Sequence, residues 1–372
     1  MYGEAFPKEV PTHFPSSRLA RALSRDPALP KAPDQNLCRA DIKGELEFVW
    51  ERYERVDMLS YLCPNLEEFE VSTAERNNIW FSVAPGSLMR LTHLSLSDLG
   101  PGLTQKFAQL CQIAAVAPNL RSLVCYRVSQ AMRFISEPNT FARLTELRFY
   151  HANISARALR HFLAACPELR SFTYIASGYS AGIVEAKPSA IQDAIIRHAP
   201  NLVFLSLYLW RYSVENIQNE SDSGAEDQVV DSSPLNTSTK MTSFARLSKL
   251  EHLALDTRCI LPDPVMTSPG QGDNSDSMFL LRLLPPSIRS LRLAGSPSNV
   301  PAVFPSCGVG PLRAALVRLV SVVPDKFPML KEVMLEALGK EEFRDVRVLF
   351  EKQGVVVELE SAHEVCEHWI YK

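Results

Sequence analysis

The residues best suited to chemistry form a G-x-S-x-G match at Gly178-Tyr179-Ser180-Ala181-Gly182. In hydrolases this serine is the nucleophile and lies on a sharp turn from a strand into a helix. A strand-like segment, 172–175, precedes the motif, but Pro188 shortens any helix that follows it. The acid and the base would have to come from residues that lie in no motif of their own, namely Asp193, His198, His252 and Asp256. We therefore interpret the motif as a Gly/Ser loop and keep a serine hydrolase using Ser180 as an alternative.

Two other segments resemble ligand-binding motifs. His363 and His368 lie five residues apart in the tail, whereas zinc-binding H-E-x-x-H places its histidines four apart, on one helical face. No further ligand pair has a spacing suited to zinc. In Gly308-Val309-Gly310-Pro311, Arg313 stands where a dinucleotide fingerprint needs glycine. The sequence therefore predicts no metal site and no cofactor.

An acidic segment contains candidate modification sites. SDSGAED, residues 221–227, resembles a phosphodegron core, and Ser223 with Glu226 fits acidophilic kinases. The other interpretation is a solvated acidic loop, which we favour. Ser221 and Ser223 are the candidate phosphorylation sites.

The elements around these residues repeat. In the segment 158–174 an apolar pattern with helical spacing ends at Cys166-Pro167, and Leu169, Phe172 and Tyr174 then follow at positions i, i+3 and i+5. This L-x-x-L-x-L pattern is typical of a short strand that buries alternate side chains. Nine copies occur, with their first residues (i) at Leu66, Leu91, Leu120, Leu144, Leu169, Leu202, Leu250, Ile288 and Leu330.

The spacing of the copies predicts the fold. The first five lie 24–29 residues apart and the later ones 33–48, which matches a leucine-rich repeat of ~20–29 residues with inserted loops. We predict an α/β leucine-rich-repeat solenoid, a horseshoe with parallel concave strands and convex helices. The helices are expected at 103–116, 129–136, 155–165, 188–199, 311–322 and 340–352, and a last strand at 355–359.

The domain boundaries follow from composition. Residues 1–40 are proline-rich and are predicted to form an arm, and a helix at 41–62 would cap the solenoid, which spans 41–360. The segments 213–243 and 262–277 are apolar-poor and are predicted to be disordered insertions. Residues 361–372 form a tail.

Bulk composition excludes several classes of protein. A net charge of −3 argues against nucleic-acid binding, and no apolar run of 18 residues could span a membrane. The N-terminus lacks the basic and apolar regions of a signal peptide. The eight cysteines, among them Cys63, Cys125 and Cys166, are predicted to be reduced thiols. We expect an intracellular protein, cytoplasmic or nuclear.

The segment 144–169 resembles the cysteine-containing leucine-rich repeat of F-box proteins. Cys166-Pro167-Glu168-Leu169 and Cys63-Pro64-Asn65-Leu66 match its Cys-Pro-x-Leu step, while Ala152 replaces a cysteine and Ile154-Ser155 replaces Ile-Thr. The irregular repeat lengths and the acidic insertion are similar to fungal members. Phe6-Pro7-Lys8-Glu9-Val10 resembles an F-box opening, but Pro11 and Pro15 would interrupt its helix.

The resemblance implies a function in protein recognition. The chain would be the substrate-binding part of an F-box-like receptor of SCF-type ubiquitin ligases, with its F-box degenerate or absent. It would bind a protein partner, with a cullin-ligase adaptor as a candidate partner of the N-terminal region. The alternative is a free-standing scaffold.

The strand pattern also predicts where the partner binds. Positions i+2, i+4 and i+6 face away from the core, and successive parallel strands lie ~4.8 Å apart. A continuous ridge is therefore expected from Tyr126, Tyr150, Ile175 and Tyr208, flanked by Arg148, Phe204 and Trp210. Acidic residues are expected at the two ends of this face, namely Glu68, Glu70, Glu332 and Glu336. Tyrosine, tryptophan and arginine are frequent interface hot spots, although strand propensity alone also favours aromatic residues here.

Overall fold

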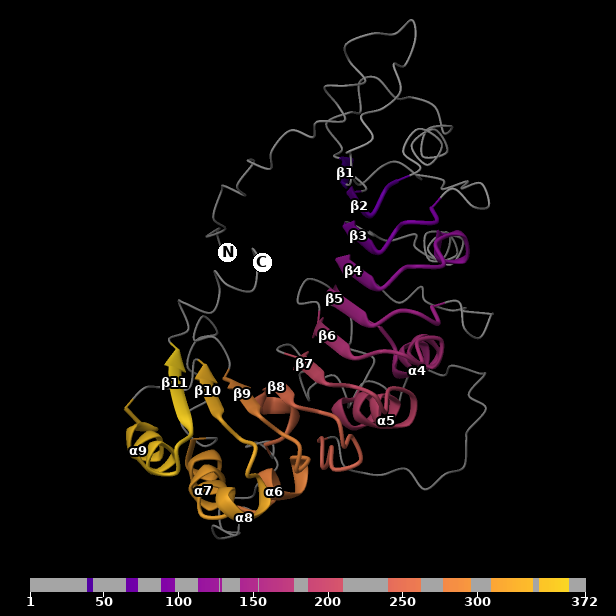
Figure 1. The fold of residues 1–372 in the computed structure, drawn as a ribbon. Helices are drawn as coiled ribbons and strands as arrows, with labels where there is room; N and C mark the ends of the chain where they lie inside the picture. Colours follow the sequence, from indigo (N-terminus) through magenta and orange to yellow (C-terminus); the bar gives the residue numbers. More distant parts are fainter. Residues whose placement is uncertain are drawn as a thin grey trace, which may run out of the picture.

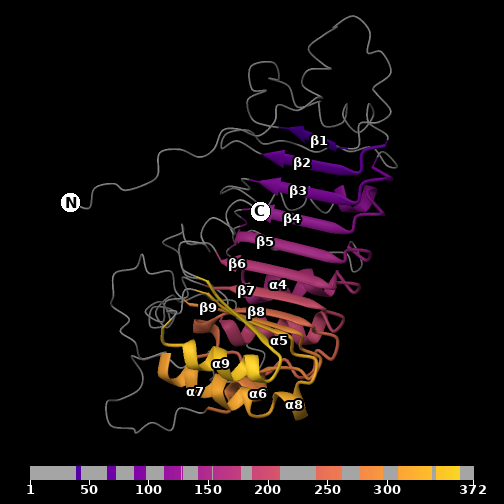
Figure 2. The same cartoon turned by 60° about the vertical axis from the view of Figure 1, so that its left-hand side comes forward.

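The chain forms an open α/β structure around one parallel sheet. The computed structural model describes residues 39–42, 65–72, 88–97, 113–126, 128, 141–152, 154–176, 187–209, 240–261, 277–295, 309–336 and 341–360. Eleven strands pair side by side in the order of the sequence, and every pairing is parallel. The strands follow an arc (Figure 1) and stack one above another with a common direction (Figure 2), so equivalent positions form rows across the sheet.

Each of the nine predicted copies contributes one strand. The strands are β1 (Arg39–Ile42), β2 (Glu68–Ser72), β3 (His93–Ser97), β4 (Ser122–Tyr126), β5 (Glu146–Ala152), β6 (Ser171–Ala176), β7 (Phe204–Tyr208), β8 (His252–Asp256), β9 (Ser290–Ala294), β10 (Glu332–Glu336) and β11 (Val356–Glu360). Strands β2–β10 coincide with the nine copies, and β11 coincides with the strand predicted at 355–359.

The helices lie on the outer side of the arc (Figure 1). They are α4 (Ala156–Ala164), α5 (Pro188–His198), α6 (Phe279–Leu283), α7 (Val309–Val320), α8 (Val323–Lys326) and α9 (Arg344–Lys352). The predictions at 155–165, 188–199, 311–322 and 340–352 correspond to α4, α5, α7 and α9. The window 103–116 is described only at 113–116, which is helical, and the window 129–136 lies outside the described residues. No helix within the described ranges is both long and apolar enough to cross a membrane.

The core lies between the sheet and the helices. All nine first residues of the copies are buried. Phe149 of β5 meets Phe162 of α4 edge to face at 5.4 Å between ring centroids, and Phe162 stacks on Phe141 at 5.0 Å. Because alternate strand residues enter this core, positions i+2, i+4 and i+6 lie on the other side, which is the inner, concave face of the arc.

One backbone arrangement joins successive copies. The carbonyl at i+1 accepts hydrogen bonds from the amides at i+1 and i+2 of the next copy. Glu67 thus accepts from Thr92 and His93 at 2.9 and 3.1 Å. The same pair of bonds occurs at eight carbonyls, those of Glu67, Thr92, Arg121, Thr145, Arg170, Val203, Glu251 and Arg289. The strand register is therefore the same whatever the length of the loop between two copies.

The Pro-Asn-Leu steps provide a second link. The side-chain amide of Asn119 donates to the carbonyl of Met89 at 2.7 Å in the previous copy and accepts from Arg143 at 2.7 Å in the next. Asn201 repeats this arrangement with the Pro167 carbonyl at 3.3 Å and the Lys249 ammonium at 2.8 Å. An asparagine at i−1 therefore connects three copies.

The Cys-Pro-x-Leu step forms a tight turn before its strand. The Leu169 amide donates to the Cys166 carbonyl at 3.2 Å, and the Cys166 thiol donates to the Phe162 carbonyl at 3.2 Å. Cys125, Cys166 and Cys259 are buried free thiols. Burial raises the pKa of Cys125 and of Cys166, so both stay protonated.

The sheet begins one strand earlier than the sequence predicted. Strand β1 occupies residues where we expected the end of the arm and the start of the helix at 41–62, and its Ala40 and Ile42 pair with Phe69 and Val71. Leu37, Ala40 and Ile42 have the i, i+3, i+5 spacing, but alanine at i+3 weakens the pattern. The remainder of that predicted helix lies outside the described residues.

The first predicted insertion also ends earlier than expected. Met241 is buried, and its amide donates to the Cys259 carbonyl at 2.8 Å. The buried Gln192 side chain accepts from the Thr242 amide at 3.0 Å and donates to the Ser243 carbonyl at 2.7 Å. Residues 240–243 of the predicted segment 213–243 are therefore part of the folded structure, and Gln192 of α5 holds Thr242 and Ser243. In the segment 262–277, Ser277 lies in the turn before α6, and the rest of both segments lies outside the described residues.

Candidate interface on the concave face

Two tyrosines on adjacent strands form a flat aromatic surface on the concave face. Tyr126 of β4 and Tyr150 of β5 pair in register. Their rings stack at 4.9 Å between centroids with an interplanar angle of 15°, within the preferred geometry for aromatic pairs. Both side chains are partly exposed, so the surface can contact a partner.

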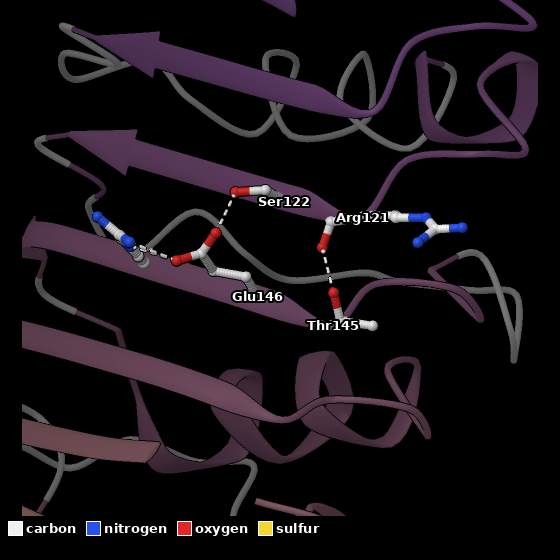
Figure 3. Close-up of polar contacts among 5 residues, drawn as sticks. Arg121, Ser122, Thr145 and Glu146 are labelled. Carbon is white, nitrogen blue, oxygen red and sulfur yellow. Dashed lines mark hydrogen bonds and ion pairs between the residues drawn. The ribbon is translucent and has the colours of Figure 1, made fainter. Parts of the chain in front are cut away.

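A carboxylate fixes the arginine beside these rings. Ser122 donates to Oε2 of Glu146 at 2.8 Å, and Nε of Arg148 donates to Oε1 at 2.7 Å. Figure 3 shows the Ser122–Glu146 bond and, at the start of the same strands, the bond from the Thr145 hydroxyl to the Arg121 carbonyl at 3.2 Å. The Arg148 side chain remains 41% exposed. The guanidinium is therefore held in place and is still accessible.

The electrostatics keep Tyr126 neutral beside a cationic arginine. Burial raises the pKa of Tyr126, the neighbouring Tyr150 and Glu70 raise it further, and Arg148 acts in the opposite direction. For Arg148, burial lowers the pKa, but Glu146 and Tyr150 together outweigh it, so the guanidinium pKa rises. The surface therefore offers hydroxyl donors and one fixed positive charge.

A β-bulge orients Tyr150. The register between β5 and β6 passes from Phe149–Tyr174 to Ala152–Ala176, so Tyr150 and His151 together face one residue of β6. His151 has φ = 52°, which is uncommon for a residue other than glycine. The buried Tyr174 hydroxyl donates to the Ala152 carbonyl and accepts from the Ile154 amide, both at 3.2 Å. Bulges re-aim side chains, and here Tyr150 has no register partner on β6.

The predicted ridge is therefore only partly present. Tyr126 and Tyr150 lie together as expected, and Ile175 is partly buried. The prediction for Tyr208 was wrong, because its side chain is 0% exposed. It packs with Ala254 and Ala294 and contacts Ile175, since alanines on β8 and β9 leave room for a large ring across those strands.

The residues predicted to flank the ridge differ in their placement. Phe204 is 36% exposed, and its ring lies 6.4 Å from that of His252. Arg148 belongs to the tyrosine surface, as described above. Trp210 lies outside the described residues.

The acidic ends of the concave face differ from each other. Glu68 is exposed and Glu70 partly so at the first end. At the other end Glu336 is fully buried and forms an ion pair with Arg292, so the expectation of an exposed carboxylate was wrong for Glu336. Glu332 is partly exposed. Ser290 donates to Glu332 at 3.1 Å, which repeats the Ser122–Glu146 arrangement. A serine at i+2 followed by a glutamate at i+2 of the next copy was a sequence signal for this link that we did not use.

Most of the remaining sequence candidates cannot be placed relative to one another, because they lie outside the described residues. Ser180, Ser221, Ser223, His363 and His368 lie outside the described residues. The residues considered as triad partners of Ser180 are divided between α5, which carries Asp193 and His198, and β8, which carries His252 and Asp256. In the described part of the chain no group of three or more His, Cys, Asp or Glu side chains could hold a metal ion.

Comparison of the chain with protein-family models found no match, and comparison with curated proteins found none either. The functional argument therefore depends on the architecture and on the concave face.

Proposed function

We propose that the chain is a leucine-rich-repeat solenoid that binds a protein partner on its concave face and has no enzymatic activity. Nine L-x-x-L-x-L copies on nine consecutive parallel strands, joined by the same backbone bonds at eight junctions, support the repeat assignment. Solenoids of this kind use their concave surface for binding.

The observation that carries the proposal is the stacked pair Tyr126–Tyr150 beside the fixed Arg148, which we call the tyrosine–arginine surface. Tyrosine and arginine are enriched among interface hot spots. Stacking and the Glu146 contact restrict these side chains before a partner arrives, so less side-chain entropy is lost on binding.

Within this proposal the chain acts as the substrate-binding part of an F-box-like ubiquitin-ligase receptor. The support is the resemblance of the Cys-Pro-x-Leu step, in which Cys166 is buried in the turn that leads into β6. The ligase link would require an adaptor that binds the N-terminal region.

Affinity purification from native cells, followed by mass spectrometry, tests the recognition step. We expect the double variant Tyr126→Ala/Tyr150→Ala to lose specific proteins that the parent retains, at a cost of ~1–3 kcal/mol per tyrosine. Val348→Ala is the matched control, because Val348 is an exposed apolar residue on α9, far from this surface. Equal recovery of these proteins with the parent and the double variant would show that the binding site lies on another surface.

Tyr208→Ala separates binding from folding. Because Tyr208 is fully buried, its removal should lower the free energy of unfolding by roughly 3–5 kcal/mol, as for other large aromatic residues. Replacing the partly exposed Tyr126 and Tyr150 with alanine should lower thermal stability much less.

The same purification also tests the proposed association with a ubiquitin ligase, through the recovery of cullin-adaptor subunits. Cullin-adaptor subunits should be recovered with the full chain and lost when residues 1–60 are deleted. If the adaptor is absent from both samples while the specific proteins are retained, the chain is a free-standing scaffold.

A further inference from the structure

A row of arginines lies along the edge of the sheet where the strands begin. Arg90, Arg121, Arg143 and Arg170 come from four successive copies, each at position i−1 or i+1, and all four are exposed. We call these four residues the basic edge. At ~4.8 Å between strands, the four copies span about 14 Å.

The basic edge lacks carboxylate partners. Among the described residues, the side chains of Arg90, Arg121 and Arg170 form no hydrogen bond or ion pair, and Arg143 bonds only to the neutral amide of Asn119. Elsewhere among the described residues, ion pairs with carboxylates are formed by Arg148, Arg289, Arg292, Arg313 and Arg347. Exposed arginines without carboxylate partners also occur elsewhere among the described residues, for example Arg246 and Arg344, but at this edge four of them lie on consecutive copies.

The ends of two helices extend the positive region. Arg160 lies on α4 and Arg197 near the end of α5, whereas the pKa of His198 is lowered by burial and by Arg197, Arg160 and His161, which favours its neutral form. Basic residues in a last turn also complement the helix dipole, which accounts for the helix ends but not for arginines at strand starts. The exposed acidic residues nearby in the sequence are Glu67, Glu68, Glu168 and Asp193, fewer than the cations.

The chemistry of this edge favours a polypeptide over a nucleic acid. No aromatic residue occupies position i−1 or i+1 in any of the nine copies, and single-stranded nucleic acids usually need aromatic stacking as well as positive charge. Guanidinium groups match carboxylates in bidentate geometry. An extended peptide advances ~3.3 Å per residue, so the row could contact about four to five residues.

We propose that the basic edge docks an acidic, extended segment of the protein that the concave face recognises. This inference rests on the proposed function, because it takes the partner to be a protein. It adds a second contact on a different surface from the tyrosine–arginine surface, with charge rather than aromatic packing as its basis.

Fluorescence anisotropy of the full chain with a labelled oligoglutamate peptide tests the proposal. We expect Arg121→Glu/Arg170→Glu to weaken binding at least about tenfold, since two charge-assisted contacts become repulsive. Arg344→Glu/Lys352→Glu is the control, because it changes the net charge equally at two exposed positions of α9. It should bind like the parent, and all variants should keep the parent's thermal stability.

Three results would overturn the proposal. The first is that the parent does not bind the oligoglutamate peptide. The second is that both charge-reversed double variants weaken peptide binding equally. The third is that the chain binds a single-stranded RNA more tightly than the peptide, in a way that depends on Arg121 and Arg170. Failure here is separable from failure of the proposed function, because Tyr126→Ala/Tyr150→Ala should leave oligoglutamate binding unchanged while it removes the captured proteins.

Discussion

Individual side chains define the concave surface through contacts between neighbouring copies. Tyr126 lies where burial, Tyr150 and Glu70 all disfavour its ionised form, and Arg148 alone among the contributing residues favours it. Arg148 is in turn held by Glu146. The pKa of Tyr126, on β4, therefore depends on residues of β2 and β5 as well.

We predict that Tyr126 ionises above the usual tyrosine value of about 10. Replacing Arg148 with leucine should raise the Tyr126 pKa further, because the guanidinium stabilises the phenolate. Tyrosinate absorbance against pH measures this, and Tyr126→Phe identifies the component. A lower pKa in Arg148→Leu would show that burial and charge have been assigned wrongly.

The asparagine at i−1 should contribute to stability through its two cross-copy bonds. Asn119→Ala removes the contacts to Met89 and Arg143, which we expect to cost about 1 kcal/mol of unfolding free energy, a typical net value for hydrogen bonds. Chemical denaturation measures the loss. Glu168→Ala is the control at the same position of another copy, and an equal loss in both variants would argue against the asparagine link.

On the scale of the elements, one ion pair joins two helices of the convex side. Arg313 of α7 pairs with Asp345 at the start of α9, with Nε of the arginine 3.2 Å from Oδ1. The hydrogen bond from Arg313 lowers the pKa of Asp345, while burial acts in the opposite direction. Both side chains are about half exposed, so solvent screens the pair and its contribution is small.

The Arg313–Asp345 pair should make stability depend on pH. Because the Asp345 pKa is lowered in the folded state, its contribution is complete above the ordinary aspartate value of about 3.9 and is lost as pH falls through the folded pKa. The melting temperature of Asp345→Asn should therefore lie slightly below that of the parent at neutral pH and converge with it in acid.

On the scale of the whole molecule, the main core of the described residues runs from Leu66 to Val357, but each copy contacts mainly its neighbours. We predict that Leu147→Ala in β5 costs about 2–5 kcal/mol and that the damage stays local. Hydrogen exchange should accelerate in β4–β6 more than in β10 and β11, because β5 pairs only with β4 and β6 and the effect of a local defect falls with distance along the sheet. Uniform acceleration along the sheet would indicate that the chain unfolds as one unit.

The sequence predicted features that depend on one copy and missed those that depend on several. The positions i, i+3 and i+5 identified nine strands because each must enter the core. The burial of Tyr208 was not predictable from its own copy, because it depends on alanines of β8 and β9. The bulge at His151 likewise depends on a hydroxyl of the next strand, that of Tyr174.

The shared junction also determines how the chain would respond to mechanical force. Pulling on its two ends would load the stacked strands in a peeling geometry, so junctions would break in succession rather than together. Each step would meet similar backbone resistance at the eight junctions. The extension per step would differ, from about 8 nm for the 24 residues between Leu120 and Leu144 to about 16 nm for the 48 between Leu202 and Leu250. Loop length would determine how far the chain extends at each rupture, and the repeated backbone hydrogen bonds would determine the force.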